Sequence, residues 1–122
     1  MPLYGKGEKV VLEESGVYLG TIAKGTAILT NQRVIFEAKV GSFLQKSSET
    51  LLDLPLTEIK NLQVRKGFLT KKAVVIEASM TSVSSTLKSA FDLTPGQLFQ
   101  IALNVKDPKK WADEIQRAIS EA

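Results

Sequence analysis

The stretch GTAILTNQRVIFEAKV, residues 25–40, decides the fold because it has the pattern of a tight β-hairpin. Apolar segments rich in β-branched residues flank the polar step Thr30-Asn31-Gln32-Arg33. Asn tolerates the left-handed conformation that a short hairpin turn requires. The stretch therefore predicts strand, tight turn and strand. It leaves open whether the hairpin is only scaffold or also carries a site.

Segments on both sides of this hairpin repeat the strand pattern. Residues 8–14 and 17–22 flank Ser15-Gly16, which predicts one strand interrupted by a bulge or turn. In TLLDLPL, residues 50–56, three leucines fall on one face and Pro55 marks an edge or an end of the strand. Further strands are predicted in residues 59–64, with Ile59, Leu62 and Val64 inward, and in residues 72–79 and 98–104. About seven strands at regular spacing indicate a closed or sandwiched antiparallel sheet.

The carboxyl end changes to a helical period. Asp107 is a natural N-cap and Pro108 a natural first helical residue. Apolar side chains then recur at helical spacing at Trp111, Ala112, Ile115, Ala118 and Ile119. This pattern predicts one amphipathic helix from about Asp107 to Ser120, whose Trp face plugs one end of a β-barrel.

Length and composition exclude several classes of protein. A chain of 122 residues suits a single domain over residues 1–122 with one core. Cysteine and histidine are both absent, so disulfides, thiolate metal sites and Ser-His-Asp triads cannot be built from this chain. We expect a protein without catalytic residues, metal or cofactor. No secretory leader and no apolar run near ~20 residues is present, so we expect a soluble, cytoplasmic protein.

The order of these elements, seven β-segments and one C-terminal helix, resembles the pleckstrin-homology (PH) superfold. Four stretches carry a resemblance to GRAM-type and GLUE-type domains: GEKVVLEESGVYLG, GTAILTNQRVIFEA, LPLTEIKNLQV and DPKKWADEIQRAI. They span residues from about 8 to 120, and the most specific part is residues 29–36. The resemblance implies a PH-like barrel and a binding module without catalysis. It does not select the ligand, because this superfold serves lipid headgroups, peptides and ubiquitin.

Basic residues gather in one part of the second half of the chain. Residues 1–64 hold seven basic and seven acidic residues, whereas residues 65–122 hold nine basic and six acidic ones. Between Glu58 and Glu77 there is no acidic residue but five cations: Lys60, Arg65, Lys66, Lys71 and Lys72. Four of them bracket the turn RKGFLTKK, whose tip carries Phe68 and Leu69. This arrangement favours insertion into an anionic membrane interface. The alternative is that the cations keep an edge strand soluble and that Phe68 covers the barrel mouth.

Two further loops place apolar side chains beside a lysine. GSFLQK carries Phe43 and Leu44, and TLKSAF carries Phe91. If the loops share one rim, they form an apolar patch for a membrane or a protein partner. They can equally plug the barrel or pair two subunits. Arg33 has two interpretations as well: a contact with nearby carbonyls and carboxylates, or an anion contact at the barrel rim.

The sequence thus predicts a peripheral membrane module that binds anionic, phosphoinositide-like lipids through the basic, Phe-tipped turn. The alternative is a protein-interaction adaptor for a ubiquitin-like or peptide partner, or a self-associating homo-oligomeric subunit that uses the same apolar rim. Nucleic acid is not expected as a partner, because the basic turn carries one aromatic residue where single-strand binders need several.

Overall fold

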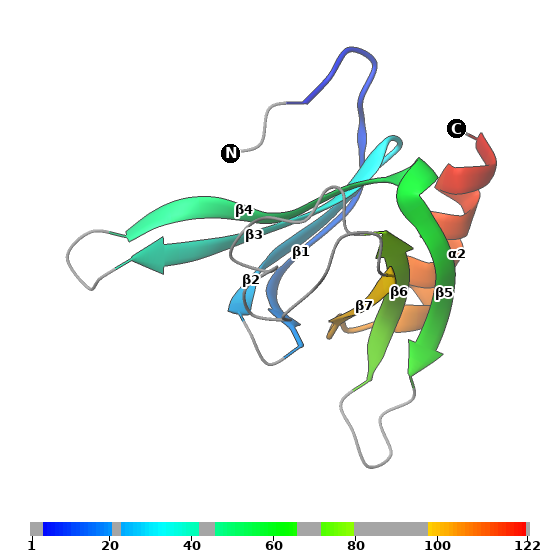
Figure 1. Ribbon diagram of the computed structural model, residues 1–122. Helices are drawn as coiled ribbons and strands as arrows, with labels where there is room; N and C mark the ends of the chain where they lie inside the picture. The colour runs from blue at the N-terminus through cyan, green and yellow to red at the C-terminus, as the bar shows by residue number, and fades with distance from the viewer. Residues whose placement is uncertain (1–3, 21–22, 42–45, 66–71, 80–97, 122) are drawn as a thin grey trace.

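The computed structural model describes residues 4–20, 23–41, 46–65, 72–79 and 98–121. Its strands form one seven-stranded sheet in the order β4-β3-β2-β1-β7-β6-β5, in which every pair of neighbours is antiparallel (Figure 1). The elements are β1 (Val10–Leu19), β2 (Ala23–Thr30), β3 (Arg33–Gly41), β4 (Lys46–Pro55), η1 (Leu56–Glu58), β5 (Ile59–Arg65), β6 (Ala73–Ser79), β7 (Leu98–Leu103) and α2 (Pro108–Glu121). Seven antiparallel strands followed by one C-terminal helix were predicted, and this architecture is confirmed.

The hairpin of β2 and β3 turns at Asn31-Gln32, as its sequence predicted. Leu29 pairs with Val34 across a connection of two residues. Residues 27–30 and 34–36 are buried on both faces of the hairpin, which explains why its sequence reads as continuous apolar runs rather than as an alternation.

β1 joins the two parts of the sheet and is interrupted where the sequence predicted. Its pairing with β2 shifts register between Glu14 and Val17, and Gly16 there has a φ of 71°, which favours glycine. β7 pairs with β1 only at Leu19, opposite Leu103. The sheet can therefore bend between β1 and β7, so that β1–β4 and β5–β7 face a common core (Figure 1).

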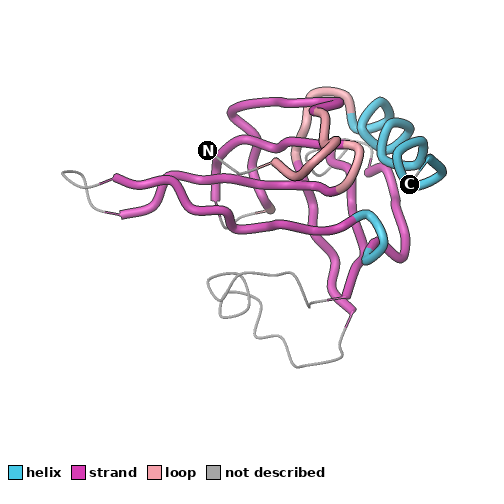
Figure 2. The backbone as a smooth tube through the Cα atoms, turned by 90° about the horizontal axis from the view of Figure 1, so that it is seen from above, coloured by secondary structure: helices cyan, strands magenta, loops and turns pink. Residues whose placement is uncertain are grey.

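α2 covers the core at one end of the sheet, away from the projecting ends of β3 and β4 (Figure 2). Its first turn is capped by Asp107, whose Oδ1 accepts the backbone amide of Lys110 at 3.2 Å. Trp111 is 3% exposed and Ile115 is fully buried, and both pack in the same cluster as Leu52 and other strand residues. The predicted helix bounds are correct to within one residue, and the burial of Trp111 is confirmed.

No helix in the described part of the chain is long and apolar enough to cross a membrane.

Candidate functional site

Polar side chains of the β2–β3 turn bind the segment that precedes β1. Asn31 donates from Nδ2 to the carbonyl oxygen of Gly7 at 3.1 Å, and its Oδ1 accepts the backbone amide of Lys9 at 2.8 Å. Gln32 donates from Nε2 to the carbonyl oxygen of Lys6 at 3.2 Å. The polar step in the hairpin is therefore used to hold the N-terminal segment in place.

Arg33 belongs to the same structural contact. Its Nε lies 2.8 Å from Oε2 of Glu8, and its Nη1 lies 2.7 Å from Oδ2 of Asp53 on β4. Thr30 donates from Oγ1 to the same Glu8 oxygen at 2.6 Å, and the Glu8 side chain is only 1% exposed. One guanidinium thus joins the N-terminal segment to β4.

Both charges in this contact are strongly stabilised. Burial raises the pKa of Glu8, but hydrogen bonds from Arg33, Thr30 and the amide of Gly5 outweigh burial and lower the pKa from 4.5 to about 2. The hydrogen bond to Glu8 raises the pKa of Arg33. Of its two interpretations, Arg33 therefore makes the contact with carboxylates. Arg33 pairs with Pro55 on β4, which lies shortly before the start of β5, so it is away from the end of the β5–β6 hairpin that carries Arg65 and Lys72.

The basic turn predicted from RKGFLTKK connects β5 to β6. Arg65 ends β5 and pairs with Ala73, and the exposed Lys72 stands immediately before β6. The pairing of the two strands therefore brings Arg65 and Lys72 to the same end of the hairpin. Lys60 is also exposed but lies near the start of β5, away from this end. The remaining predicted residues of this turn lie outside the described residues: Lys66, Phe68, Leu69 and Lys71.

A groove of about 360 Å³ lies between this end of the hairpin and the start of α2. Cationic and apolar residues dominate its lining, which consists of Val64, Arg65, Lys72, Lys106, Asp107, Pro108 and Lys109. Within the described part of the chain, Arg65, Lys72 and Lys106 make no ion pair with a carboxylate. Lys109 lies 3.4 Å from Asp113, but both side chains are well exposed, so this pair adds little stability. The groove therefore presents excess positive charge, with Asp107 as its one described carboxylate.

Val64 corrects one prediction from the sequence. It was expected to point inward with Leu62, which packs against the core, yet Val64 is 42% exposed. The two residues share a face of β5, but Val64 lies two residues closer to the end of the strand, where the groove opens beside Pro108. Val64 therefore supplies apolar surface to the groove instead of filling the core.

Lys106 and Lys109 are groove residues that the sequence analysis missed. Lys106 comes from the connection between β7 and α2 and Lys109 from the first turn of α2, both more than thirty residues after Lys72 in the chain. The run KDPKK, residues 106–110, was interpreted only as a helix start. Its three lysines were a sign of a basic site, but only the folded chain shows which of them face Arg65 and Lys72.

The apolar residues of the other two predicted loops, Phe43, Leu44 and Phe91, lie outside the described residues. The strand ends that flank residues 42–45 project from one side of the molecule, whereas the ends that flank residues 66–71 point in another direction (Figure 1). These strand ends give no support to one shared rim.

Comparisons with known proteins agree with the fold. No protein-family model matches the sequence, and no curated protein matches it. Among solved structures, the chain is similar to the "Vps36 N-terminal PH domain", with a TM-score of 0.61 and 21% identity over 98% of this chain and 85% of that one. It is also similar to a chain of "The 8S snRNP Assembly Intermediate", with a TM-score of 0.54 and 8% identity over 92% of this chain and 80% of that one. At these identities the likeness establishes the architecture, and the chain has a pleckstrin-homology-like fold.

Proposed function

We propose that this domain is a noncatalytic module that binds anionic lipid headgroups at a membrane surface, through the groove between the β5–β6 hairpin and α2. The observation that carries the proposal is the lining of this groove, in which four cations from three parts of the chain surround one space. Those cations are Arg65, Lys72, Lys106 and Lys109. A membrane-facing role would place the domain at the cytoplasmic face of a membrane as a peripheral protein.

The chemistry of the groove favours a phosphorylated headgroup over a diffuse negative surface. A phosphate monoester carries up to two negative charges on a small group with three acceptor oxygens. Arg and Lys bind such a group through charge-assisted hydrogen bonds, and Arg can do so with two parallel N–H donors. Serine lipids carry one net negative charge, spread over a phosphodiester, a carboxylate and an ammonium group, so they offer the four cations a less concentrated charge than a phosphate monoester does. We therefore infer a preference for phosphoinositide-like headgroups.

The turn itself, residues 66–71, is part of the same proposal as an insertion element. Lys66, Lys71 and the apolar pair Phe68 and Leu69 stand in the sequence between the two groove residues Arg65 and Lys72. A headgroup held in the groove would bring this turn to the membrane interface. A GRAM-type or GLUE-type assignment is a further part of the proposal, suggested by the sequence motifs and by likeness to a PH domain.

Two neighbouring lysines give a matched test of the groove. Lys109 lines the groove and Lys110 does not, although both are exposed on the first turn of α2. Lys109→Met and Lys110→Met therefore remove the same charge at adjacent positions. Binding is measured by co-sedimentation with phosphatidylcholine vesicles that contain a phosphoinositide, phosphatidylserine or no anionic lipid. A cation near the membrane surface contributes ~1 kcal/mol, so Lys109→Met should weaken phosphoinositide binding about fivefold and Lys110→Met clearly less.

Asp107 offers a variant that should bind more tightly. Asp107→Asn removes the carboxylate from the groove but keeps an N-cap side chain, since Asn caps helices as well as Asp does. We expect this variant to fold normally and to bind phosphoinositide vesicles about fivefold more tightly. Equal losses for Lys109→Met and Lys110→Met, with no gain for Asp107→Asn, would show that general surface charge and not the groove drives binding. No binding to any anionic vesicle at low salt would refute the membrane function.

A further inference from the structure

Among the residues that the structure describes, the outer edge of β1 has no strand partner over most of its length. β2 pairs with the other edge from Val10, opposite Thr30, to Leu19, opposite Ala23. β7 pairs with β1 at Leu19, and the carbonyl of Tyr18 accepts the backbone amide of Asn104 at 3.0 Å, so within the described part of the chain the edge joins no strand before Tyr18. Unpaired backbone groups along a strand are a template for one more strand.

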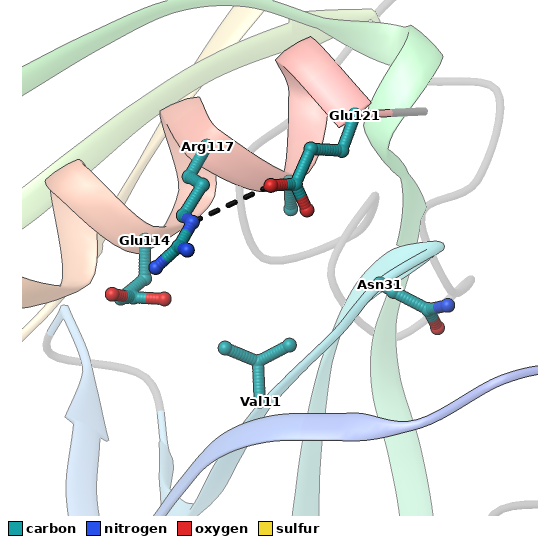
Figure 3. Close-up of a pocket in the computed structure, with 6 residues that line it drawn as sticks. Val11, Asn31, Glu114, Arg117 and Glu121 are labelled. Carbon is teal, nitrogen blue, oxygen red and sulfur yellow. Dashed lines mark hydrogen bonds and ion pairs between the residues drawn. The ribbon is translucent and has the colours of Figure 1, made fainter.

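A crevice of about 310 Å³ lies between this part of β1, the β2–β3 turn and the second half of α2 (Figure 3). Its lining residues are Val11, Asn31, Glu114, Arg117, Ala118 and Glu121. Val11 points from β1 toward the helix and is 40% exposed, and its neighbour Val10 is exposed as well. The crevice therefore combines apolar surface from Val11 and Ala118 with a charged rim from α2.

The charges on this rim favour a basic partner. The rim carries two carboxylates, Glu114 and Glu121, and one guanidinium, that of Arg117, whose Nε lies 3.4 Å from Glu121 (Figure 3). Glu114 is half-buried and makes no ion pair or hydrogen bond to any other described side chain. Two residues away on either side of Val11, Lys9 and Glu13 are both exposed and carry opposite charges, so the net charge of the crevice comes from its rim on α2. The crevice is thus locally acidic in a protein whose net charge is +3.

We propose that this crevice binds an extended basic segment of a partner protein, which adds a strand to the free edge of β1. Backbone hydrogen bonds to β1 would supply affinity, and side chains at alternate positions would supply specificity. An apolar side chain of the segment packs against Val11 and Ala118, and a Lys or Arg side chain pairs with Glu114.

This site is separate from the basic groove and does not depend on it. The groove contacts the first turn of α2 through Lys109, and the crevice contacts the helix from Glu114 to Glu121. Lys109 and Arg117 are eight residues apart, or about 12 Å along a helix that rises 1.5 Å per residue. The two sites also carry opposite charge. One domain can therefore hold a membrane headgroup and a basic peptide at the same time.

Amide NMR of the isotope-labelled protein tests the proposal. The probe is a short capped peptide of alternating lysine and valine, compared with an alternating glutamate and valine peptide and with a lysine peptide whose valines are replaced by proline. We expect the first peptide to shift the amide signals of β1 around Val11 and those of α2 from Glu114 to Ala118. The proline peptide lacks the donors that a strand needs, so it should bind at least fivefold more weakly.

A matched pair of charge variants separates specific pairing from general attraction. Glu114 lines the crevice and the adjacent Asp113 does not. Glu114→Gln should weaken binding of the lysine-valine peptide about three- to tenfold, whereas Asp113→Asn should change it less than about twofold. Equal effects of the two variants, equal binding of the proline or glutamate peptide, or no shift at β1 would overturn the proposal. Shifts at β1 that depend on protein concentration alone would show that a second copy of the chain occupies the edge instead.

Discussion

At Arg33, one guanidinium meets carboxylates from two distant parts of the chain. Asp53 lies opposite the hairpin on β4, and Glu8 comes from the segment before β1. The sequence indicated that Arg33 could contact a carboxylate, but it could not identify Glu8. That contact spans 25 residues, and Asn31 and Gln32 hold the backbone of the same N-terminal segment in place. The spacing of apolar residues along the chain indicates where a strand lies. It carries no information on which distant segment packs against that strand in the fold.

The ion pair of Glu8 and Arg33 predicts a pH dependence of stability. The pKa of Glu8 is about 2 in the folded protein and near 4.5 in the unfolded chain. Its contribution to the free energy of unfolding is therefore complete above about pH 4.5 and is lost as the pH falls through 2. The pKa difference sets an upper limit of roughly 3 kcal/mol, and partial exposure of Arg33 and Asp53 reduces this to about 1–2 kcal/mol.

Urea unfolding of the wild type and Glu8→Gln at several pH values measures this contribution. The variant should be less stable by about 1–2 kcal/mol at pH 6, and the two proteins should converge as the pH falls toward 2, where protonation of Glu8 in the folded protein is half complete. A stability difference that stays constant over this range would mean that the charge of Glu8 has no role in the contact.

At the scale of the element, local sequence signals were enough to predict α2. They were not enough to predict which residues surround it in the fold. The N-cap Asp107, the initial Pro108 and the spacing of Trp111 and Ile115 all act within a few residues, so the sequence alone places the helix. These short-range signals do not reveal the groove, because its lining residues come from separate parts of the chain. Only the folded chain shows which strand end faces the first turn, and this is why Lys109 was missed and Val64 was placed in the core.

Trp111 tests whether α2 is required as the cover of the core. It is 3% exposed and belongs to the same buried cluster as Leu56 and Ile115. Trp111→Ala should lower the free energy of unfolding by about 3–5 kcal/mol, because truncation of a buried aromatic side chain leaves a cavity. Gln116→Ala, at an exposed position of the same helix, is the control and should change stability by less than ~0.5 kcal/mol. Thermal and urea unfolding measure both, and an unchanged melting temperature for Trp111→Ala would contradict the role of the helix.

At the scale of the molecule, the order of strands in the sheet places the contact of Arg33 and the basic groove far apart. The β2–β3 turn and the contact of Arg33 lie at one end, and the open end of β5 and β6 with the basic groove lies at the other (Figure 1). The number of strands and their order along the chain followed from the sequence because each strand has its own apolar pattern, alternating or continuous, and is bounded by turn residues. The distribution of sites over the sheet did not follow, because it depends on how β1 and β7 meet through the single pair Leu19 and Leu103.

The proposed membrane function predicts that charge and insertion act separately in the turn between Arg65 and Lys72. Replacing both Lys71 and Lys72 with Glu should weaken binding to anionic vesicles and flatten its dependence on anionic lipid, because that attraction is electrostatic and screened by salt. The matched control replaces Lys6 and Lys9, two exposed lysines beside the β2–β3 turn, with Glu in the same way. This variant should weaken binding to anionic vesicles much less.

Phe68→Ala should instead reduce the part of the binding that high salt leaves intact. Full burial of a Phe side chain contributes about 1.5 to 3 kcal/mol, so complete insertion predicts a loss of roughly ten- to a hundredfold in affinity, and partial insertion predicts less. Co-sedimentation with anionic vesicles at low and high salt separates the two contributions, and thermal unfolding shows whether each variant is folded. An inserting side chain contributes little to the core, so Phe68→Ala should keep its melting temperature. If the melting temperature falls by many degrees while vesicle binding is unchanged, Phe68 is a core residue, and the groove has to bind lipid without insertion of the turn.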